Sequence, residues 1–222
     1  MPALALAVAA IAVPDSLNPS LIVAAVYLAL GSRRVRSTAA FTAAAFAVTL
    51  SGGLLIALGL GDLILSLVPK PAPTLKYALM VAAGVALVCG GAALWWRRDS
   101  LTKHTSPRDR DVAGSVGSAA LMGASIGGLE LLTAFPYFAA IALIVGSSVS
   151  LAGKVFLVVL YNVIYVLPLI AIVIVCAVMG ERAGRVLAPI GEWVATHWPA
   201  MVAPLAAIAG LALTTYGITR LA

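Results

Sequence analysis

Six long apolar runs separated by short polar connections dominate the hydrophobic pattern of this chain of 222 residues. A helix that crosses the hydrocarbon core of a membrane needs about 20 mainly apolar residues, and each run is long enough or nearly so. The pattern therefore predicts an all-α integral membrane protein with six transmembrane helices. The predicted spans cover residues 3–30, 38–60, 75–96, 115–145, 151–179 and 198–216.

Two of these runs are longer than one straight helix would need. As continuous helices, residues 3–30 and 115–145 would each exceed about 40 Å, which is more than the hydrocarbon core requires. Each is interrupted near its centre by proline and polar residues, as "PDSLNPS" in the first and "GGLELLTAFPY" in the second. We therefore expect the first and fourth helices to be broken at mid-membrane, at Pro19 and Pro136.

The two interrupted runs also suggest an internal repeat. Aligned on their prolines, "DSLNPSLIVAAVYLALG" lies over "LTAFPYFAAIALIVGSS", and each opens a half with three predicted spans. Three spans per half make the halves cross the bilayer in opposite senses. This predicts two inverted three-helix repeats, residues 1–96 and 115–222, joined by a linker at 97–114. In such transporters the binding site typically lies near the midplane, between broken helices.

Charge sets the expected orientation. The chain has 14 Lys and Arg and 8 Asp and Glu, for a net charge of +6. Ten of the basic residues fall in the first, third and fifth connections, and four fall on the other side of the predicted membrane. The side with ten basic residues, which includes the 97–114 linker, should be cytoplasmic. Both termini are then expected outside. Because the basic residues lie in loops, nucleic acid is not expected as a partner. The start "MPALALAVAAIAV" lacks the basic region of a cleavable signal peptide, so we expect a true span there.

Asp15 and Glu130 are the ionisable residues expected near mid-membrane. A charge at this depth is costly and points to a cavity, a partner or a bound proton. Asp15 fits a proton-coupling group, but it could also cap the half-helix that follows the break. These roles are compatible, because a helix N-terminus is itself an anion-attracting site. Glu130 occupies a similar depth in the other half, which favours a paired role over a simple polar contact.

Further polar and small residues lie near the breaks. Asn18 and Thr133 flank the two prolines, where they could line a site or satisfy backbone groups that the prolines release. Asn162, within "YNVIYVLP", carries an amide that needs partners in a dry interior, and lining the cavity is one of its two open interpretations. The small pair Gly52 and Gly53 predicts close helix packing.

Other chemistries lack their residues. Hydrolase, metalloprotease and nucleotide-binding motifs are missing from the sequence, so we expect no enzymatic activity and no cofactor. His104 and His197 lie in loops, so we expect no metal site within the membrane. Cys89 and Cys176 have no CxxC spacing, which argues against a disulfide or metal site.

Taken together, "PDSLNPS" in the first span and the broken segment "ELLTAFPYF" in the fourth resemble the LysE superfamily of small secondary transporters. The branch most similar is the GAP family of peptidoglycolipid- or sulfolipid-addressing proteins, whose members are implicated in delivering glycolipids to the cell surface. The resemblance implies that Asp15, Asn18 and Pro19 form a first signature, with Glu130 and Pro136 as its partner. Disulfide-electron carriers of similar architecture need cysteines where this chain has Asn18 and Phe135. Nickel and cobalt exporters need His-rich segments that this chain lacks.

These observations predict a multi-pass protein of the bacterial inner membrane. The expected function is secondary transport that exports a lipid-linked or amphiphilic, glycolipid-type substrate toward the cell surface, with proton coupling through the mid-membrane acids left open. The expected partners are membrane lipids and the amphiphilic substrate, and assembly into a homo-oligomer is also left open. The alternatives are an exporter of small polar solutes such as amino acids and a non-transporting scaffold for lipid-synthesis enzymes.

Overall fold

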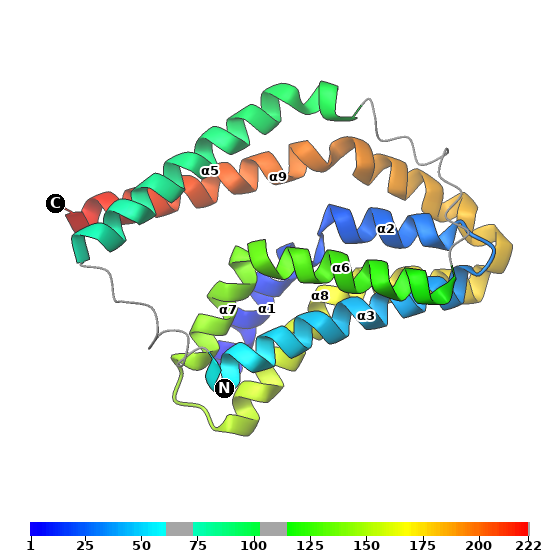
Figure 1. Ribbon diagram of the computed structural model, residues 1–222, viewed down its shortest axis with the longest axis horizontal. Helices are drawn as coiled ribbons and strands as arrows, with labels where there is room; N and C mark the ends of the chain where they lie inside the picture. The colour runs from blue at the N-terminus through cyan, green and yellow to red at the C-terminus, as the bar shows by residue number, and fades with distance from the viewer. Residues whose placement is uncertain (61–72, 103–114, 222) are drawn as a thin grey trace. The chain divides into compact units, whose positions relative to one another are not determined.

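The computed structural model describes residues 1–60, 73–102 and 115–221, and these residues are almost entirely helical (Figure 1). No β-strand occurs among the described residues. The helices and short helical segments follow one another along the chain as α1 (Pro2–Ser16), α2 (Pro19–Ala29), α3 (Arg34–Leu55), the π-helical segment η1 (Ile56–Leu60), α5 (Pro73–Thr102), α6 (Val116–Thr133), α7 (Phe135–Val145), α8 (Leu151–Met179), the 3-10 segment η3 (Gly180–Arg182) and α9 (Ala183–Leu221).

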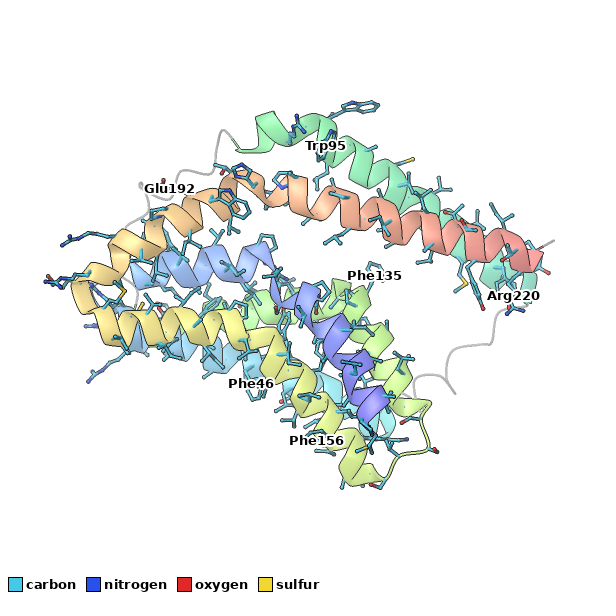
Figure 2. The ribbon with its side chains drawn as sticks, turned by 180° about the vertical axis from the view of Figure 1, so that it is seen from behind. Phe46, Trp95, Phe135, Phe156, Glu192 and Arg220 are labelled. Carbon is cyan, nitrogen blue, oxygen red and sulfur yellow. The ribbon has the colours of Figure 1, made fainter. Side chains whose placement is uncertain are left out.

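The helix lengths and composition are those of a multi-pass membrane protein. Among the described residues, three helical stretches are long and apolar enough to cross a membrane: Arg34–Gly59, Met80–Arg98 and Leu151–Leu221. Two bent helix pairs raise this number to five if each pair is one span. Large apolar side chains also point outward, among them Phe135 and Phe156, which are 70% and 55% exposed (Figure 2). Such side chains are expected on helices whose solvent is lipid.

The two predicted interruptions are present. The α1 and α2 helices meet at a bend of 58°, and the pair Val116–Leu131 and Phe135–Val145 is bent by 70°. Pro19 is the first residue of α2, and Pro136 lies in the first turn of α7. Proline is tolerated there because its missing N–H would have no partner in the helix. With 11 residues each, α2 and α7 are only about 16 Å long, roughly half of the hydrocarbon thickness.

The chain forms two compact units. Unit 1 comprises Met1–Ser66 and Asp109–Glu192, and unit 2 comprises Leu67–Arg108 and Trp193–Ala222. Each unit combines segments from both halves of the sequence, so the units are not the predicted repeats themselves. The division into repeats stays a prediction. The first residues of the predicted 97–114 linker continue α5 to Thr102, and residues 103–114 lie outside the described part of the chain.

Unit 1 is built around α3, which runs alongside α6 and also packs on α8 (Figure 1). The approach of α3 to α6 is close because α6 carries glycine at the contact. A Cβ atom on Gly123 would lie 2.3 Å from the carbonyl oxygen of Phe41, and one on Gly127 would lie 3.4 Å from the Cα of Ala45. Small residues at such contacts let helix backbones pack closely within a membrane.

Unit 2 is a pair of helices, α5 and the main part of α9, packed by the same principle. A Cβ atom on Gly84 would lie 2.6 Å from the Gly210 carbonyl oxygen, and one on Gly91 would lie 2.9 Å from the Ala203 carbonyl oxygen. Gly84 and Gly91 are two helical turns apart and therefore face the same side of α5. The contact between the two helices thus depends on the absence of side chains along one stripe.

The connection predicted as a loop before the sixth span is mostly helical. Only η3 separates α8 from α9, which starts at Ala183 and has 39 residues. The physical reason is a buried face with a spacing of four, made by Ala183, Leu187 and Gly191. A Cβ atom on Gly191 would lie 2.6 Å from Val26 Cγ1, so this first part of α9 packs directly on α2 within unit 1.

Candidate functional site

Asp15 lies in the last turn of α1, directly before the first break. Its side chain is half-buried, and its Oδ2 atom accepts a hydrogen bond of 2.7 Å from the hydroxyl of Tyr161 on α8. A carboxylate that ends a helix inside an apolar protein needs such donors. Asp15, at the break, therefore contacts one face of α8.

Asn18 caps the half-helix that follows the break. Its Oδ1 atom accepts from the backbone N–H of Ser20 at 3.1 Å, and Asn18 is the N-cap residue of α2. The alternative that Asp15 caps α2 is therefore wrong. The prediction that Asn18 satisfies a backbone group near Pro19 is confirmed, because it takes one of the N–H groups that have no partner at a helix start.

Glu130 lies near the end of α6, close to the second break, and also contacts α8. Its Oε2 atom accepts a hydrogen bond of 2.7 Å from the hydroxyl of Tyr165. Its Oε1 atom is a hydrogen-bond partner of the Ser20 hydroxyl, and the Asn18 side chain also interacts with its carboxyl group. The acid of the second half therefore reaches the break of the first half directly.

The Ser20 hydroxyl sits between two acceptors. It lies 2.8 Å from Asn18 Oδ1 and is also bonded to Glu130 Oε1. A serine hydroxyl has one proton to donate and two lone pairs that accept. An ionised Glu130 therefore competes with Asn18 for that proton, whereas a protonated Glu130 can donate to Ser20 while Ser20 donates to Asn18. Asn18 Oδ1 accepts from the Ser20 backbone N–H in either case, so a proton on Glu130 changes which partner receives the Ser20 hydroxyl.

Two tyrosines on α8 hold the two acids. Tyr161 and Tyr165 are four residues apart, so they project from the same face of the helix, and both are buried. Tyr161 packs edge-on against Tyr137 of α7, with 4.9 Å between the ring centroids. This pair of tyrosines makes α8 the element that receives both Asp15 and Glu130.

The network continues from α7 to α3. The Tyr137 hydroxyl donates to the backbone carbonyl oxygen of Thr49 at 2.6 Å. Asn162, which is fully buried, donates through Nδ2 to the Tyr137 hydroxyl at 3.2 Å and to the Val158 carbonyl oxygen at 2.8 Å. These contacts form two groups, one around Asp15 and one around Glu130, which meet at the neighbouring Tyr161 and Tyr165 of α8. We call both groups together the polar cluster. Its members are Asp15, Asn18, Ser20, Glu130, Tyr137, Tyr161, Asn162 and Tyr165.

Gly53 makes room for one member of this cluster. A Cβ atom at Gly53 would lie 1.8 Å from the Tyr137 hydroxyl oxygen and 3.1 Å from Val158 Cγ1, and one at Gly52 would lie 2.3 Å from Leu131 Cδ2. The close packing predicted for both glycines is confirmed. At Gly53 that packing has a chemical consequence, because it lets the Tyr137 hydroxyl reach its partner on α3.

The structure brings together four of the seven predicted site residues: Asp15, Asn18, Glu130 and Asn162. Pro19 begins α2 beside them, whereas Pro136 is exposed in the first turn of α7. Thr133 is the last residue of α6, and its side chain lies outside the described part of the chain.

The residues that the sequence interpretation missed are Ser20 and the three tyrosines, Tyr137, Tyr161 and Tyr165. One signal for them was available. Two tyrosines four residues apart in an apolar run place two hydroxyl groups on one helix face, and a buried tyrosine hydroxyl usually finds a partner. Asp15 and Glu130, the ionisable residues expected at mid-membrane, are possible acceptors, but the sequence does not show which way α8 faces.

The groups around the acids are hydroxyls and amides, which suit the exchange of protons and the binding of polar headgroups. Within the described ranges, His, Cys, Asp and Glu do not form any group of three or more that could hold a metal ion. Both cysteines are free thiols, with Cys89 exposed and Cys176 buried. The partners of Asp15 and Glu130 that the structure shows are therefore protein hydroxyl and amide groups.

The fold and the polar cluster define a class: an all-helical, multi-pass membrane protein in which two helix breaks deliver acids to one interior face. Comparison with known protein families makes this more specific. Residues 8–219 match the family described as Sap, sulfolipid-1-addressing protein, and the chain belongs to this family. The GAP-type resemblance is thereby confirmed, while membership of the wider LysE superfamily stays a prediction. The searches found no matching curated protein and no matching solved structure.

Proposed function

We propose that this protein is a secondary transporter of the bacterial inner membrane that exports a lipid-linked or amphiphilic substrate toward the cell surface. One observation carries the proposal. Asp15 and Glu130, which lie beside breaks in two different predicted spans, meet neighbouring tyrosines on one face of α8. A scaffold for other enzymes has no evident need for two acids brought together in an apolar interior, because ionisable groups at that depth are costly.

The proposal includes six spans arranged as two inverted repeats. The pairs α1–α2 and α6–α7 are each taken as one broken span, and α3, α5, α8 and α9 as the others. In this assignment unit 1 contains the first and second spans of both halves, and unit 2 contains the third span of both halves. Equivalent spans thus fall into the same unit, which supports an internal symmetry. Broken helices at a repeat interface are the usual place of a transporter's binding site.

Proton exchange at the acids would supply the driving force. The Ser20 hydroxyl can donate to Asn18 while Glu130 holds a proton, whereas an ionised Glu130 competes with Asn18 for that single donor. Gain or loss of that proton would therefore change the contact between the α6 end and the start of α2. A coupled transporter needs such a difference between two states, because a ligand or proton shifts an equilibrium only by its differential interaction.

The surroundings of the breaks favour an amphiphile over a small polar solute. Val13 and Leu17 beside the first break are 55% and 50% exposed, and Leu129 and Phe135 beside the second are 67% and 70% exposed. Polar groups at the breaks are thus flanked by apolar surface, which suits a molecule with a polar head and an apolar body. The family's description, which names a sulfolipid, supports the same class of substrate.

The test replaces the two acidic side chains with amides of nearly the same shape, which removes their charge and their ability to exchange a proton. The gene is deleted in its host, the strain is complemented with Asp15→Asn, Glu130→Gln or the matched control Glu181→Gln, and labelled surface lipids are extracted and quantified. Glu181 lies in η3, outside the polar cluster. We expect deletion to reduce a class of surface lipid at least about tenfold, Glu181→Gln to restore it, and the other two variants to fail.

Membrane extracts from the same strains measure protein level, so that a variant that does not accumulate is not counted as inactive. Full restoration by both Asp15→Asn and Glu130→Gln would remove the acids from the mechanism. A scaffold would be indicated instead if deletion stops synthesis of the lipid, so that it is missing from whole cells as well. An unchanged lipid profile with internal accumulation of amino acids would point to the polar-solute exporter.

A further inference from the structure

Two polar connections, one from each half of the sequence, meet at one end of unit 1. Arg34, at the start of α3, donates through Nη1 to the carbonyl oxygen of Gly180 at 2.7 Å. Gly180 ends α8 with a φ of +52°. The last carbonyl groups of a helix have no partners within it, and a guanidinium group there also complements the helix dipole. Figure 1 shows the α2–α3 connection and the α8–α9 connection at the same end of unit 1.

This end of the unit is strongly basic. The stretches "GSRRVR" and "GERAGR" contain five arginines and one acid, Glu181. Arg34 is engaged with Gly180, but the other four arginine side chains are exposed. We call these four residues the basic end: Arg33, Arg36, Arg182 and Arg185.

Apolar surface continues the basic end along the first turns of α9. One face of this segment is buried on unit 1 through Ala183 and Leu187. On the outside, Val186, which directly follows Arg185, and Ile190 are 41% and 46% exposed. Val186 and Ile190 lie four residues apart on one stripe of α9, which begins four residues after Arg182 in the preceding η3. A stripe that combines basic and apolar side chains is typical of helices that lie in the membrane interface.

We propose that the basic end is a docking surface for acidic phospholipid headgroups, with Val186 and Ile190 at the boundary of the acyl chains. Charge complementarity carries the assignment, because clustered arginines beside a membrane attract the anionic lipids of the adjoining leaflet. Bulk phospholipid is the occupant rather than the exported amphiphile. The four arginine side chains are exposed, and such a surface selects for charge rather than for the structure of one headgroup. The inference requires the chain to lie in a membrane and is independent of transport.

The test measures lipid binding by the purified full-length protein in neutral detergent, where orientation in a membrane has no influence. The probes are phosphatidylglycerol and phosphatidylcholine, and bound lipid is counted by native mass spectrometry. We expect the wild-type protein to prefer phosphatidylglycerol at least about tenfold, since each basic residue contributes to the attraction. The fourfold variant of the basic end, with each arginine changed to glutamine, should lose that preference, and Arg34 stays in place to cap α8.

The matched control removes four positive charges elsewhere and should keep the preference. It combines Arg97→Gln, Arg98→Gln, Lys154→Gln and Arg220→Gln. A fourfold arginine-to-lysine variant of the basic end should also keep it, because the charge is retained. Circular dichroism verifies the helix content of every variant. If the fourfold glutamine variant does not fold, the pairs Arg33/Arg36 and Arg182/Arg185 are changed separately.

Three results would overturn the proposal. The first is a retained preference in the folded glutamine variants. The second is an equal loss in the matched control, which would assign the preference to net charge alone. The third is binding of a surface-lipid extract from the host without any preference for phosphatidylglycerol. This result would indicate that the surface binds the exported substrate rather than bulk phospholipid.

Discussion

Replacing Gly53 with alanine is the sharpest test of the packing that builds the polar cluster. The new Cβ atom would lie 1.8 Å from the Tyr137 hydroxyl oxygen and 2.8 Å from its Cζ. Because Tyr137 packs against Tyr161, the ring cannot retreat without losing contacts. The hydroxyl would give up its bond to the Thr49 carbonyl oxygen and the bond it accepts from Asn162.

The expected loss can be worked from these contacts. Two hydrogen bonds contribute about 1 kcal/mol each, and overpacking of a tight core adds about 1–3 kcal/mol. Replacing glycine with alanine within a helix stabilises the folded protein by about 1 kcal/mol, because alanine has the higher helix propensity. The net prediction is a fall of about 2–4 kcal/mol in the free energy of unfolding.

The assay is reversible unfolding of the purified protein in mixed micelles of a mild detergent and dodecyl sulfate, followed by circular dichroism. Gly128→Ala in α6 is the matched control, because its nearest atom would be Val48 Cγ1 at an ordinary 3.9 Å. It should leave stability unchanged or raise it by up to about 1 kcal/mol. If the Gly53→Ala protein is as stable as the Gly128→Ala protein, the predicted clash is wrong, and so is the placement of the Tyr137 hydroxyl beside Gly53.

Three further predictions test the site and the topology. Asn18→Ala should lower stability by about 1 kcal/mol because α2 loses its cap, whereas Asn18→Ser should lose less; equal unfolding of both variants and the wild type would contradict the cap. Tyr161→Phe removes the donor to Asp15 and should lower the free energy of unfolding by about 1–3 kcal/mol in the same assay, and an unchanged value would show that the bond adds no stability. Single cysteines at Ser106 and Ser148, in a variant without the native cysteines, should react with impermeant reagents from opposite sides of the membrane; labelling from one side would break the inverted-repeat argument.

The helix breaks could be predicted from the sequence because each combines proline with polar residues in an over-long run, whereas α8 continues through Pro168 within an apolar run. A proline inside an over-long apolar run cannot continue a straight helix without losing a hydrogen bond, and both predicted interruptions are present. A shared role of Asp15 and Glu130 was expected because they lie at similar depth beside the two predicted breaks. The capping role was misassigned in part, although Pro19 as the first residue of α2 already points to Asn18 as the cap.

The tyrosines could not be assigned in the same way. Whether Tyr161 faces an acid, lipid or another helix depends on how α8 is rotated, and that rotation is set by contacts with α3 and α1 far away in sequence. The start of α9 was missed for a related reason. Its charged residues suggest a loop, but its buried face becomes evident only once Val26 of α2 is present to contact Gly191.

The glycine contacts between α5 and α9 have a consequence for how the chain is made. Gly84 of α5 packs against Gly210 of α9. Because α9 lies much later in the sequence, α5 is synthesised long before its packing partner. At about 5–20 residues per second, α5 waits on the order of ten seconds in the membrane with its stripe of glycines uncovered. During that time the stripe is open to any other helix with small residues, including an α5 from a neighbouring nascent chain. Biogenesis of this protein therefore has a vulnerable interval that closes only when α9 arrives, and slowing translation after α5 should lengthen that interval and increase mispairing.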